Sequence, residues 1–514
     1  MPDVNAPMRL SPDAVLLPGQ AHAATGLDVV VRAGRIEAIL PRGQGDVPSV
    51  ALPGQLLMPG AVNAHQHGRG VTNLQYGFRD ERLETSLHAR MGHGKLDPYW
   101  ATMLAARRMI ASGITGCVQG NVPYGTGDFV GETAKILSAY ADSGLRALVC
   151  LGALDRAHIV YPHLDEAAFL ASLPADLAAA MQARRKPPYA PDAAATIAAM
   201  SALLGDWGNH PRLSLGYGPA GPQWLSDEAF AALASDARKR GLMLHYHCLE
   251  SWTQRAACDR LYPEGCLERM HRLGALHDRV SIAHGVWLDD HDIDVAAQAD
   301  AALVRCAGSN LNLAVGIAPT TRYAAAGLRV AIGTDGRTID DSEDIWREAR
   351  LVAALANGDS WSDPEPIDAA ALLKMLTVNG ARAAGFADVG EIRAGWHADM
   401  IAVDLPLLSG TYVDSDLPIL DLLAKRMTAE CVRMTMVGGR ILYRDGIFAD
   451  PKLARADSEA AVQARRAKAT TDPAGRSLSA RLRPHLESHY RSWVPTSPTR
   501  HAADARAHVP VSGL

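Results

Sequence analysis

The chain has 514 residues, 48% of them hydrophobic, which is enough to bury a large core. Its formal net charge of -5 excludes the overall basic field that attracts nucleic acid or membrane surfaces. Seven dispersed cysteines without a CxxC pair indicate reduced thiols in a cytoplasmic protein. The first residues lack the pattern of a signal peptide, and no apolar run is long enough to cross a bilayer.

Short β-type runs open the chain. Three of them precede residue 58, alternate with turns, and predict a small antiparallel sheet that is too short to bury a core alone. Similar runs recur near the other end, at 398–404 and 433–443. We expect segments 1–58 and 388–450 to pack together as one small β-sandwich, with the intervening chain inserted between them.

The segment from 59 to 387 alternates β-type runs with helix-like segments, which is typical of a parallel sheet. The eight runs are the one that ends at 65–67 and those at 114–121, 146–155, 213–221, 242–251, 280–287, 302–310 and 329–336. We therefore predict an α/β fold, a (β/α)8 TIM-type barrel inserted in the β-sandwich. The connection at 156–212 is unusually long, and the sequence leaves open whether it is a lid.

The end of the chain differs in charge from the rest. Residues 451–514 carry 11 Lys and Arg against 5 Asp and Glu, whereas the remainder carries 40 against 51. Residues 453–469 and 477–493 have the composition of helices, and the last dozen or so residues that of a disordered tail. We expect a basic helical extension that packs on the acidic body rather than a segment that binds nucleic acid.

Polar side chains end several of the β-type runs. His65 and His67 are two residues apart, so on a strand both imidazoles point to one face. An isolated pair of this kind is usually no more than two polar residues, but His247 and Asp335 end two further runs. The carboxyl ends of barrel strands meet at one face, where active sites lie. Three imidazoles and one carboxylate suit one divalent metal ion per chain, with zinc favoured over iron or manganese.

Other polar residues complete this predicted site. Glu250 follows His247 by three positions, where a carboxylic acid could carry protons. His284 ends the sixth run and would orient water or polarise a substrate. His245 also points into the barrel, where a hydrogen-bonded interior role is favoured over metal ligation. Asp335 could instead cap the next helix, but the histidines that end the other β-type runs favour a role as metal ligand.

The loop after His67 contains charged side chains that could contact a small-molecule substrate, although such groups are more often solvated. The candidates are Arg79, Arg82, His88 and Arg90. Asn310, at the end of the seventh run, is a further candidate for substrate binding.

Several stretches resemble those of one enzyme superfamily. They are PGAVNAHQH at 59–67, HCLE at 247–250, AHG at 283–285, SNLNLAVGIAP at 309–319, GTDG at 333–336, TVNGARAAG at 377–385, GEIRAGWHADMIAVD at 390–404 and VGGRILYRDG at 437–446. The chain resembles the amidohydrolase superfamily, in the branch of cytosine-deaminase-like and triazine-hydrolase-like enzymes. The loop after His67 matches no substrate-specific subgroup, so the resemblance leaves the substrate open.

The resemblance implies a mononuclear metal site and a homodimer or larger homo-oligomer. The implied ligands are His65, His67, His247 and Asp335. Glu250 would be the proton shuttle, His284 would hold the hydroxide, and Asp335 would serve as a second acid and base. Members of the superfamily that hold two metals bridge them with a carboxylated lysine on the fourth strand. This chain reads LSLGYGPAG there and has no lysine, which favours one metal.

Two enzymatic hypotheses and one other follow from this site. The first is deamination of an N-heterocycle, such as a pyrimidine, purine or triazine, by metal-bound hydroxide. The second is hydrolysis of an amide, substituted urea or carbamate, or dechlorination of an azine, at the same site. The third is a non-catalytic barrel scaffold, which the complete set of site residues disfavours.

Overall fold

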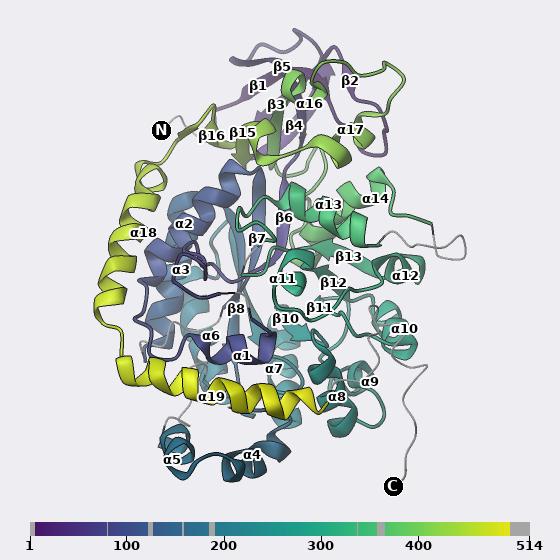
Figure 1. Ribbon diagram of the computed structural model, residues 1–514. Coiled ribbons are helices and arrows are strands. Elements are labelled where there is room, and N and C mark those ends of the chain that lie inside the picture. The colour runs from purple at the N-terminus through teal and green to yellow at the C-terminus, as the bar shows by residue number, and fades with distance from the viewer. Residues whose placement is uncertain are drawn as a thin grey trace.

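The computed structural model describes residues 6–79, 81–121, 127–156, 159–183, 191–336, 338–356 and 365–493. Within these residues the strands form two sheets, a parallel one surrounded by helices and a mixed one at one end of the molecule (Figure 1). The parallel sheet carries the candidate site.

Within the described residues, the parallel sheet has eight strands that follow one another in sequence order. They are β6 (Ala61–Gln66), β7 (Ile114–Asn121), β8 (Arg146–Ala153), β9 (Leu213–Pro219), β10 (Met243–Cys248), β11 (Val280–His284), β12 (Ala302–Arg305) and β13 (Arg329–Ile332). A bridge between Gln66 and Asp335 joins the last strand to the first. This arrangement confirms the predicted (β/α)8 barrel.

Helices cover the outside of the barrel. They include α2 (Pro98–Ala111), α3 (Phe129–Ser143), α6 (Ala193–Trp207), α7 (Asp227–Arg240), α8 (Trp252–Leu261), α9 (Cys266–Arg272), α10 (Asp290–Gln298), α11 (Ala307–Asn312), α12 (Thr320–Ala325), α13 (Ile345–Ala356), α14 (Ala369–Leu376) and α15 (Val378–Ala383). The α7 helix shows how the sequence sets such boundaries. The Ser226 hydroxyl accepts from the Ala229 amide, and Gly241 ends the helix with a positive φ of 67°.

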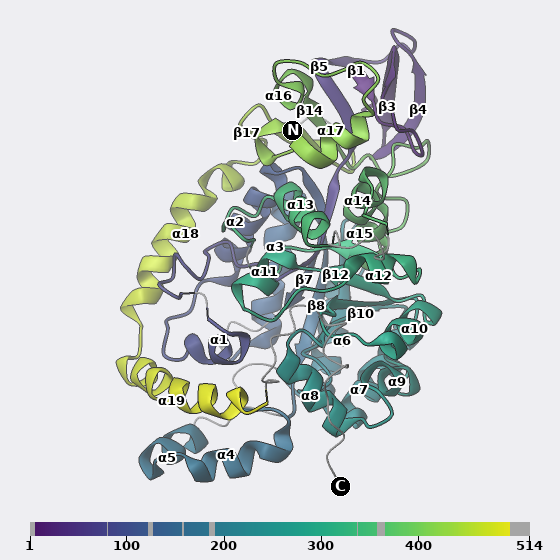
Figure 2. The same ribbon diagram turned by 45° about the vertical axis from the view of Figure 1, so that its right-hand side comes forward.

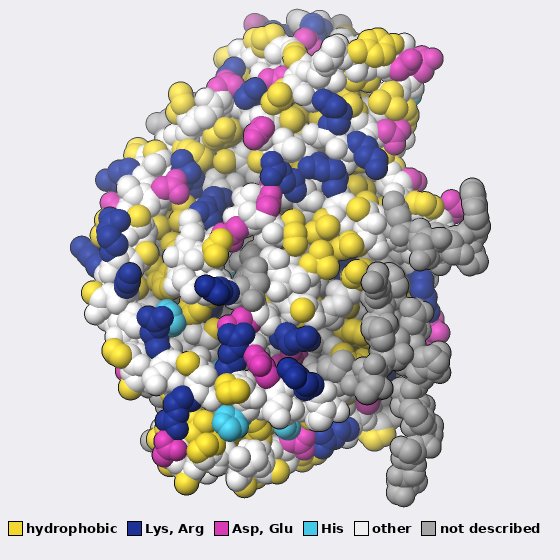
Figure 3. All heavy atoms as spheres, in the orientation of Figure 1, with side chains coloured by type: hydrophobic (Ala, Val, Ile, Leu, Met, Phe, Trp, Pro, Cys, Tyr) yellow, Lys and Arg dark blue, Asp and Glu magenta, His cyan; other side chains and the backbone are white. Residues whose placement is uncertain are grey.

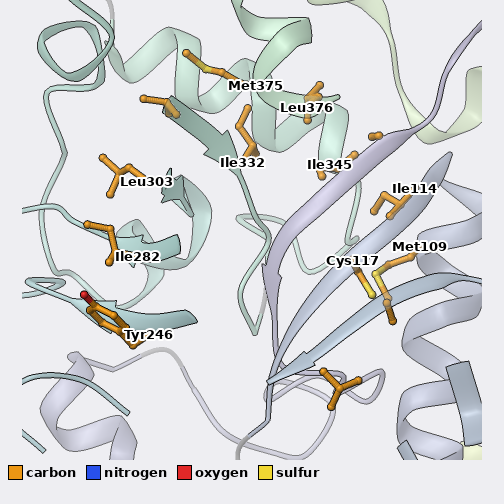
Figure 4. Close-up of a cluster of buried hydrophobic side chains, with 14 of the residues drawn as sticks. Met109, Ile114, Cys117, Tyr246, Ile282, Leu303, Ile332, Ile345, Met375 and Leu376 are labelled. Carbon is orange, nitrogen blue, oxygen red and sulfur yellow. The ribbon is translucent and has the colours of Figure 1, made fainter. Parts of the chain in front are cut away.

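The main core lies between the barrel strands and these helices. Tyr246, Ile282, Leu303 and Ile332 come from the four neighbouring strands β10 to β13, and all are buried (Figure 4). Full burial of an apolar side chain of this size contributes about 1.5–3 kcal/mol. Such contacts on every strand fix the barrel, and so fix where the strands end.

The mixed sheet joins the two ends of the chain. Its strands are β1 (Met8–Val15), β2 (Ala24–Thr25), β3 (Leu27–Arg32), β4 (Arg35–Pro41), β5 (Ser49–Pro59), β14 (Met400–Asp404), β15 (Val432–Val437), β16 (Arg440–Arg444) and β17 (Ile447–Phe448). The junction is the antiparallel pair β5 and β14, in which Leu57 lies opposite Ala402. The N- and C-terminal strands therefore meet as expected, although β1 and β5 run parallel rather than antiparallel. Helices α16 (Leu405–Ser409) and α17 (Ile419–Arg426) follow β14.

Two long helices end the described chain, α18 (Pro451–Ala469) and α19 (Pro473–Arg491). The α18 helix runs down one side of the barrel, and α19 crosses between α1 (Leu83–Ala89) and the pair α4 (Glu166–Ser172) and α5 (Ala175–Ala183) (Figures 1 and 2). Every fourth residue of α19 faces this contact, because Leu478, Leu482, Leu486 and Tyr490 are buried in one cluster with α4 and α5.

Helices thus occupy both segments of the extension that the sequence predicted as helical, whereas the expected disordered end falls on 494–514, outside the described residues. Lys and Arg side chains gather along the edge of the molecule where α18 lies (Figure 3). Arg455, Arg465 and Lys468 are exposed residues of this helix. Among the described residues, no helix has the length and apolar character needed to cross a membrane.

Candidate metal centre

Three histidines and one aspartate meet at the carboxyl end of the barrel. They are His65, His67, His247 and Asp335, and one ligand atom from each lies within 4.8 Å of all the others. The Asp335 Oδ1 atom lies 2.9 Å from Nε2 of His67 and 3.3 Å from Nε2 of His65. Nε2 of His67 lies 3.4 Å from Nε2 of His247. The four residues come from β6, β10 and the segments that follow β6 and β13, as the sequence predicted.

Backbone carbonyls orient two of the imidazoles. Nδ1 of His67 donates to the Gly120 carbonyl at 2.7 Å, and Nδ1 of His247 donates to the Ala220 carbonyl at 3.0 Å. With the proton held on Nδ1, the Nε2 lone pair of each ring is left to face the centre. Hydrogen bonds of this kind are the usual way in which a protein sets the tautomer of a metal-binding histidine.

A second histidine orients His65. Nδ1 of His65 lies 2.7 Å from Nε2 of His245, and Nδ1 of His245 lies 2.7 Å from the Ser281 hydroxyl. Because Nε2 of His65 faces Asp335, its Nδ1 donates to His245, which in turn donates to Ser281. His245 therefore has a hydrogen-bonded interior role, the one that the sequence favoured over ligation.

The backbone brings Asp335 to the centre directly from β13. Its amide donates to the His65 carbonyl at 2.9 Å, and its φ of 54° lies in the left-handed region. The Ser309 hydroxyl donates to its Oδ2 atom. Gly333 makes this approach possible, because a Cβ there would lie 2.7 Å from the His65 amide nitrogen. A positive φ at a residue other than glycine, as at Asp335, is a backbone strain that is typical of functional sites.

The donor set fits a divalent transition metal. Burial lowers the pKa of His65, and lowers that of His247 well below its usual value, so both imidazoles are neutral donors. Burial would raise the pKa of Asp335, but the His65 and His67 imidazoles beside its Oδ1 atom hold that pKa well below its usual value, so it is a carboxylate. Nε2 of His65 is buried and has no hydrogen bond within the described residues. A bound metal ion would give this nitrogen the partner that it lacks.

A second carboxyl group lies beside these ligands. Glu250, His284 and Asp335 also bring one ligand atom each within 4.8 Å of one another, and Oε1 of Glu250 is 3.6 Å from Nδ1 of His284. Burial, followed by the charges of Asp335 and Glu84, raises the pKa of Glu250 well above its usual value. Burial lowers the pKa of His284 to about 3. The raised pKa favours the protonated form of Glu250, and His284 is neutral near pH 7.

Comparison with known proteins agrees with this centre. The profile of the amidohydrolase family matches residues 56–442, which span the barrel and the strands on either side. The chain belongs to the amidohydrolase family. It is 31% identical to the 5′-deoxyadenosine deaminase of Methanosarcina mazei over 428 residues, 81% of this chain and 88% of that enzyme.

Two further proteins match this amidohydrolase over nearly their full length. One is the 5-methylthioadenosine/S-adenosylhomocysteine deaminase of Nitratidesulfovibrio vulgaris strain Hildenborough, 28% identical over 85% of this chain and 92% of that protein. The other is the crystal structure of an adenosine deaminase from Xanthomonas campestris with bound zinc. It has 25% identity and a TM-score of 0.75, and the match covers 90% of this chain and 99% of that one.

The other predicted site residues fall in different places. In this amidohydrolase Asn310 contacts His284 rather than standing free in the site, with 2.9 Å between its amide and Nδ1. His88 bonds to the Ile159 carbonyl at 2.9 Å, and Arg90 donates to the Asn73 side chain. Arg79 and Arg82 are exposed. Substrate contacts by these residues stay predictions.

One buried acid near the centre has no sequence signal. Glu84 lies in the first turn of α1 with 9% of its surface exposed, and accepts a hydrogen bond at 2.7 Å from Ser251, the residue after Glu250. In the sequence it is one of several charges in a polar loop. Only the contact between α1 and the β10 strand end reveals it.

Proposed function

We propose that this amidohydrolase deaminates an aminated N-heterocycle, with the purine ring of an adenosine-type nucleoside as the first candidate. The observation that carries the proposal is the buried Glu250 carboxyl beside the His-His-His-Asp centre. The relatives named above as deaminases of adenosine-type compounds support the same reaction. Deamination consumes water, replaces the ring C–NH2 by C=O and releases ammonia.

The four ligands would hold one ion, for which we propose zinc. A divalent ion of this kind supplies a Lewis acid that lowers the pKa of water toward neutrality. Glu250 can give its proton to the ring nitrogen next to the attacked carbon, which makes that carbon more electrophilic. The Asp335 carboxylate can accept a proton from the attacking water, since the neighbouring imidazoles keep its pKa low and the group ionised. Glu250 then takes the remaining proton of the added oxygen and gives it to the amine as it leaves, and Asp335 returns its proton to Glu250.

His284 would act by a hydrogen bond rather than by titration, because its pKa is far below 7. Its Nε2 atom is buried and makes no hydrogen bond within the described part of the chain. Asn310 donates to Nδ1, so the single proton of the neutral ring lies on Nε2. That N–H is positioned to stabilise negative charge on the oxygen added to the ring.

The test is ammonia release by the zinc-loaded protein. We would compare adenosine, 5′-deoxyadenosine, 5′-methylthioadenosine, S-adenosylhomocysteine, guanine, cytosine, aminotriazines, substituted ureas and a chlorotriazine. We expect turnover of at least one adenosine-type compound. Chloride release, or cleavage of ureas with no turnover of any aminated ring, would overturn the proposal in favour of the second hypothesis.

Three further expectations from the sequence remain proposals. We propose that the protein is cytoplasmic, that it forms a homodimer or larger homo-oligomer, and that its functional units follow the predicted boundaries at 58, 388 and 450. Light scattering on the purified protein tests the oligomer, since a mass near the monomer's 54.7 kDa would contradict it.

A further inference from the structure

The carboxylate of Glu84 is held by three hydroxyl groups. Its Oε1 atom accepts from Tyr161 at 2.7 Å, from Ser251 at 2.7 Å and from Thr253. All three donors are buried, and they come from two segments far apart in the sequence. The hydroxyl of Ser251 also lies 2.7 Å from that of Thr253, so the donors form one connected group. This arrangement fixes the position of one oxygen, and the hydrogen bonds to Glu84 from the described residues all reach Oε1 rather than Oε2.

The position of Glu84 places it at the candidate active site. Ser251 directly follows Glu250, so the hydrogen bond from Ser251 holds the Glu84 carboxylate next to the segment that carries Glu250. Helix α1 lies between the barrel and α19 in both ribbon views (Figures 1 and 2). Glu84 is therefore in the layer that covers the carboxyl end of the barrel.

The charge of Glu84 lacks a positive partner. Its three donors are neutral, and among the described residues no lysine or arginine pairs with it. Buried charges in proteins are normally paired, because hydroxyl donors replace only part of the water that an ion loses. Glu81, three residues earlier, shows the usual arrangement, since it pairs with Arg483 at 2.7 Å.

We propose that Glu84 is a specificity residue that binds a positively charged nitrogen group of the substrate, such as an ammonium or amidinium, apart from the ring carbon that reacts. The proposal rests on the proposed function, because the substrate is taken to be an aminated heterocycle. The cation would form an ion pair with Oε2 of Glu84, while the three hydroxyls keep Oε1 in place. A substrate without the cation would leave the charge of Glu84 without a positive partner.

The test uses three nucleosides that differ in one group at the 5′ position. They are 5′-amino-5′-deoxyadenosine, adenosine and 5′-deoxyadenosine, which carry an ammonium, a hydroxyl and a hydrogen at pH 7. We would measure kcat/KM by ammonia release, and Kd by calorimetry on a Glu250→Gln variant. We expect the ammonium compound to be preferred about tenfold or more over 5′-deoxyadenosine in both measurements.

Glu84→Gln should remove this preference, because the amide keeps the Oε1 acceptor and loses only the charge. Glu81→Gln, on the same segment, should retain the preference. Equal or undetectable binding of the three compounds to the Glu250→Gln variant, in which Glu84 is intact, would overturn the proposal even if Glu84→Gln failed to fold. A preference that survives in folded Glu84→Gln would also overturn it. Deamination without a preference would overturn the role of Glu84 alone. A calorimetric preference without ammonia release would overturn the proposed function alone.

Discussion

The Asn310 side chain decides which nitrogen of His284 carries the proton. In the orientation that satisfies all neighbours, the Asn310 amide nitrogen donates to the Cys306 carbonyl at 3.2 Å and to Nδ1 of His284 at 2.9 Å, while its oxygen accepts from Arg305 at 3.3 Å. His284 is neutral, so its one proton must lie on Nε2, which faces the site. Asn310 thus acts on the reaction through His284.

Asn310→Asp should lower kcat by roughly two orders of magnitude, because a carboxylate at Nδ1 draws the proton away from Nε2. KM should change little. The control is Asn312→Asp on the same helix, whose amide bonds to the Thr338 carbonyl at 3.2 Å away from His284. Steady-state kinetics on both variants would check this, and an unchanged kcat in Asn310→Asp would show that the tautomer does not matter.

Glu250→Gln should bind metal normally but lose most of its turnover. The amide has nearly the same shape and cannot supply a proton, so kcat should fall by about 10²–10⁴-fold. Metal content and kcat, measured on the same preparation, check the prediction. Full turnover with metal bound would remove Glu250 from the mechanism.

Leu482→Ala should loosen the contact of α19 with the rest of the chain. Leu482 is fully buried in the cluster formed with α4 and α5, and such truncations cost about 2–5 kcal/mol of unfolding free energy. Ser488→Ala, at an exposed position of the same helix, should stay within about 0.5 kcal/mol of wild type. Urea unfolding compares them, and equal stability of the two variants would mean that the contact contributes little.

Glu348 should make the protein less stable above neutral pH. Burial raises the pKa of its carboxyl to about 7, and its Oε2 is buried without a hydrogen bond from the described residues. Because the folded-state pKa exceeds the unfolded one, the stabilisation is present below the unfolded value, near 4.5, and is lost as pH rises through 7.

Glu348→Gln should remove this dependence. Between pH 5 and pH 8 the unfolding free energy of wild type should fall relative to that of the variant by up to about 3 kcal/mol. Glu430→Gln, at an exposed position, should follow wild type. Denaturation series at several pH values measure the difference, and parallel curves for wild type and Glu348→Gln would contradict the assignment.

The metal centre could be predicted from the sequence because its residues end strands. Side chains alternate between the two faces of a β-strand, which placed His65 and His67 on one face. The strand–helix alternation predicted a barrel, in which the carboxyl ends of β10 and β13 lie at the same face. His245 was ambiguous in the sequence, since it shares the face of His247, and the depth of each residue in the barrel decides between them.

Contacts between distant segments could not be predicted. The Glu84 carboxylate is positioned by hydrogen bonds from Tyr161 and Ser251, which lie 77 and 167 residues away along the chain. The stripe of apolar residues on α19 predicted a helix but not the surface it covers. The start of α19 was predicted at Ser477, yet the helix begins at Pro473, where the Asp472 cap and the proline were a usable signal.

Metal stoichiometry tests the central claim most directly. We would measure bound metal by mass spectrometry on wild type, His247→Ala and His245→Ala. The account predicts about one equivalent of a divalent ion in wild type, its loss in His247→Ala, and its retention at reduced affinity in His245→Ala. Two equivalents in wild type, or full retention of metal in His247→Ala, would contradict it.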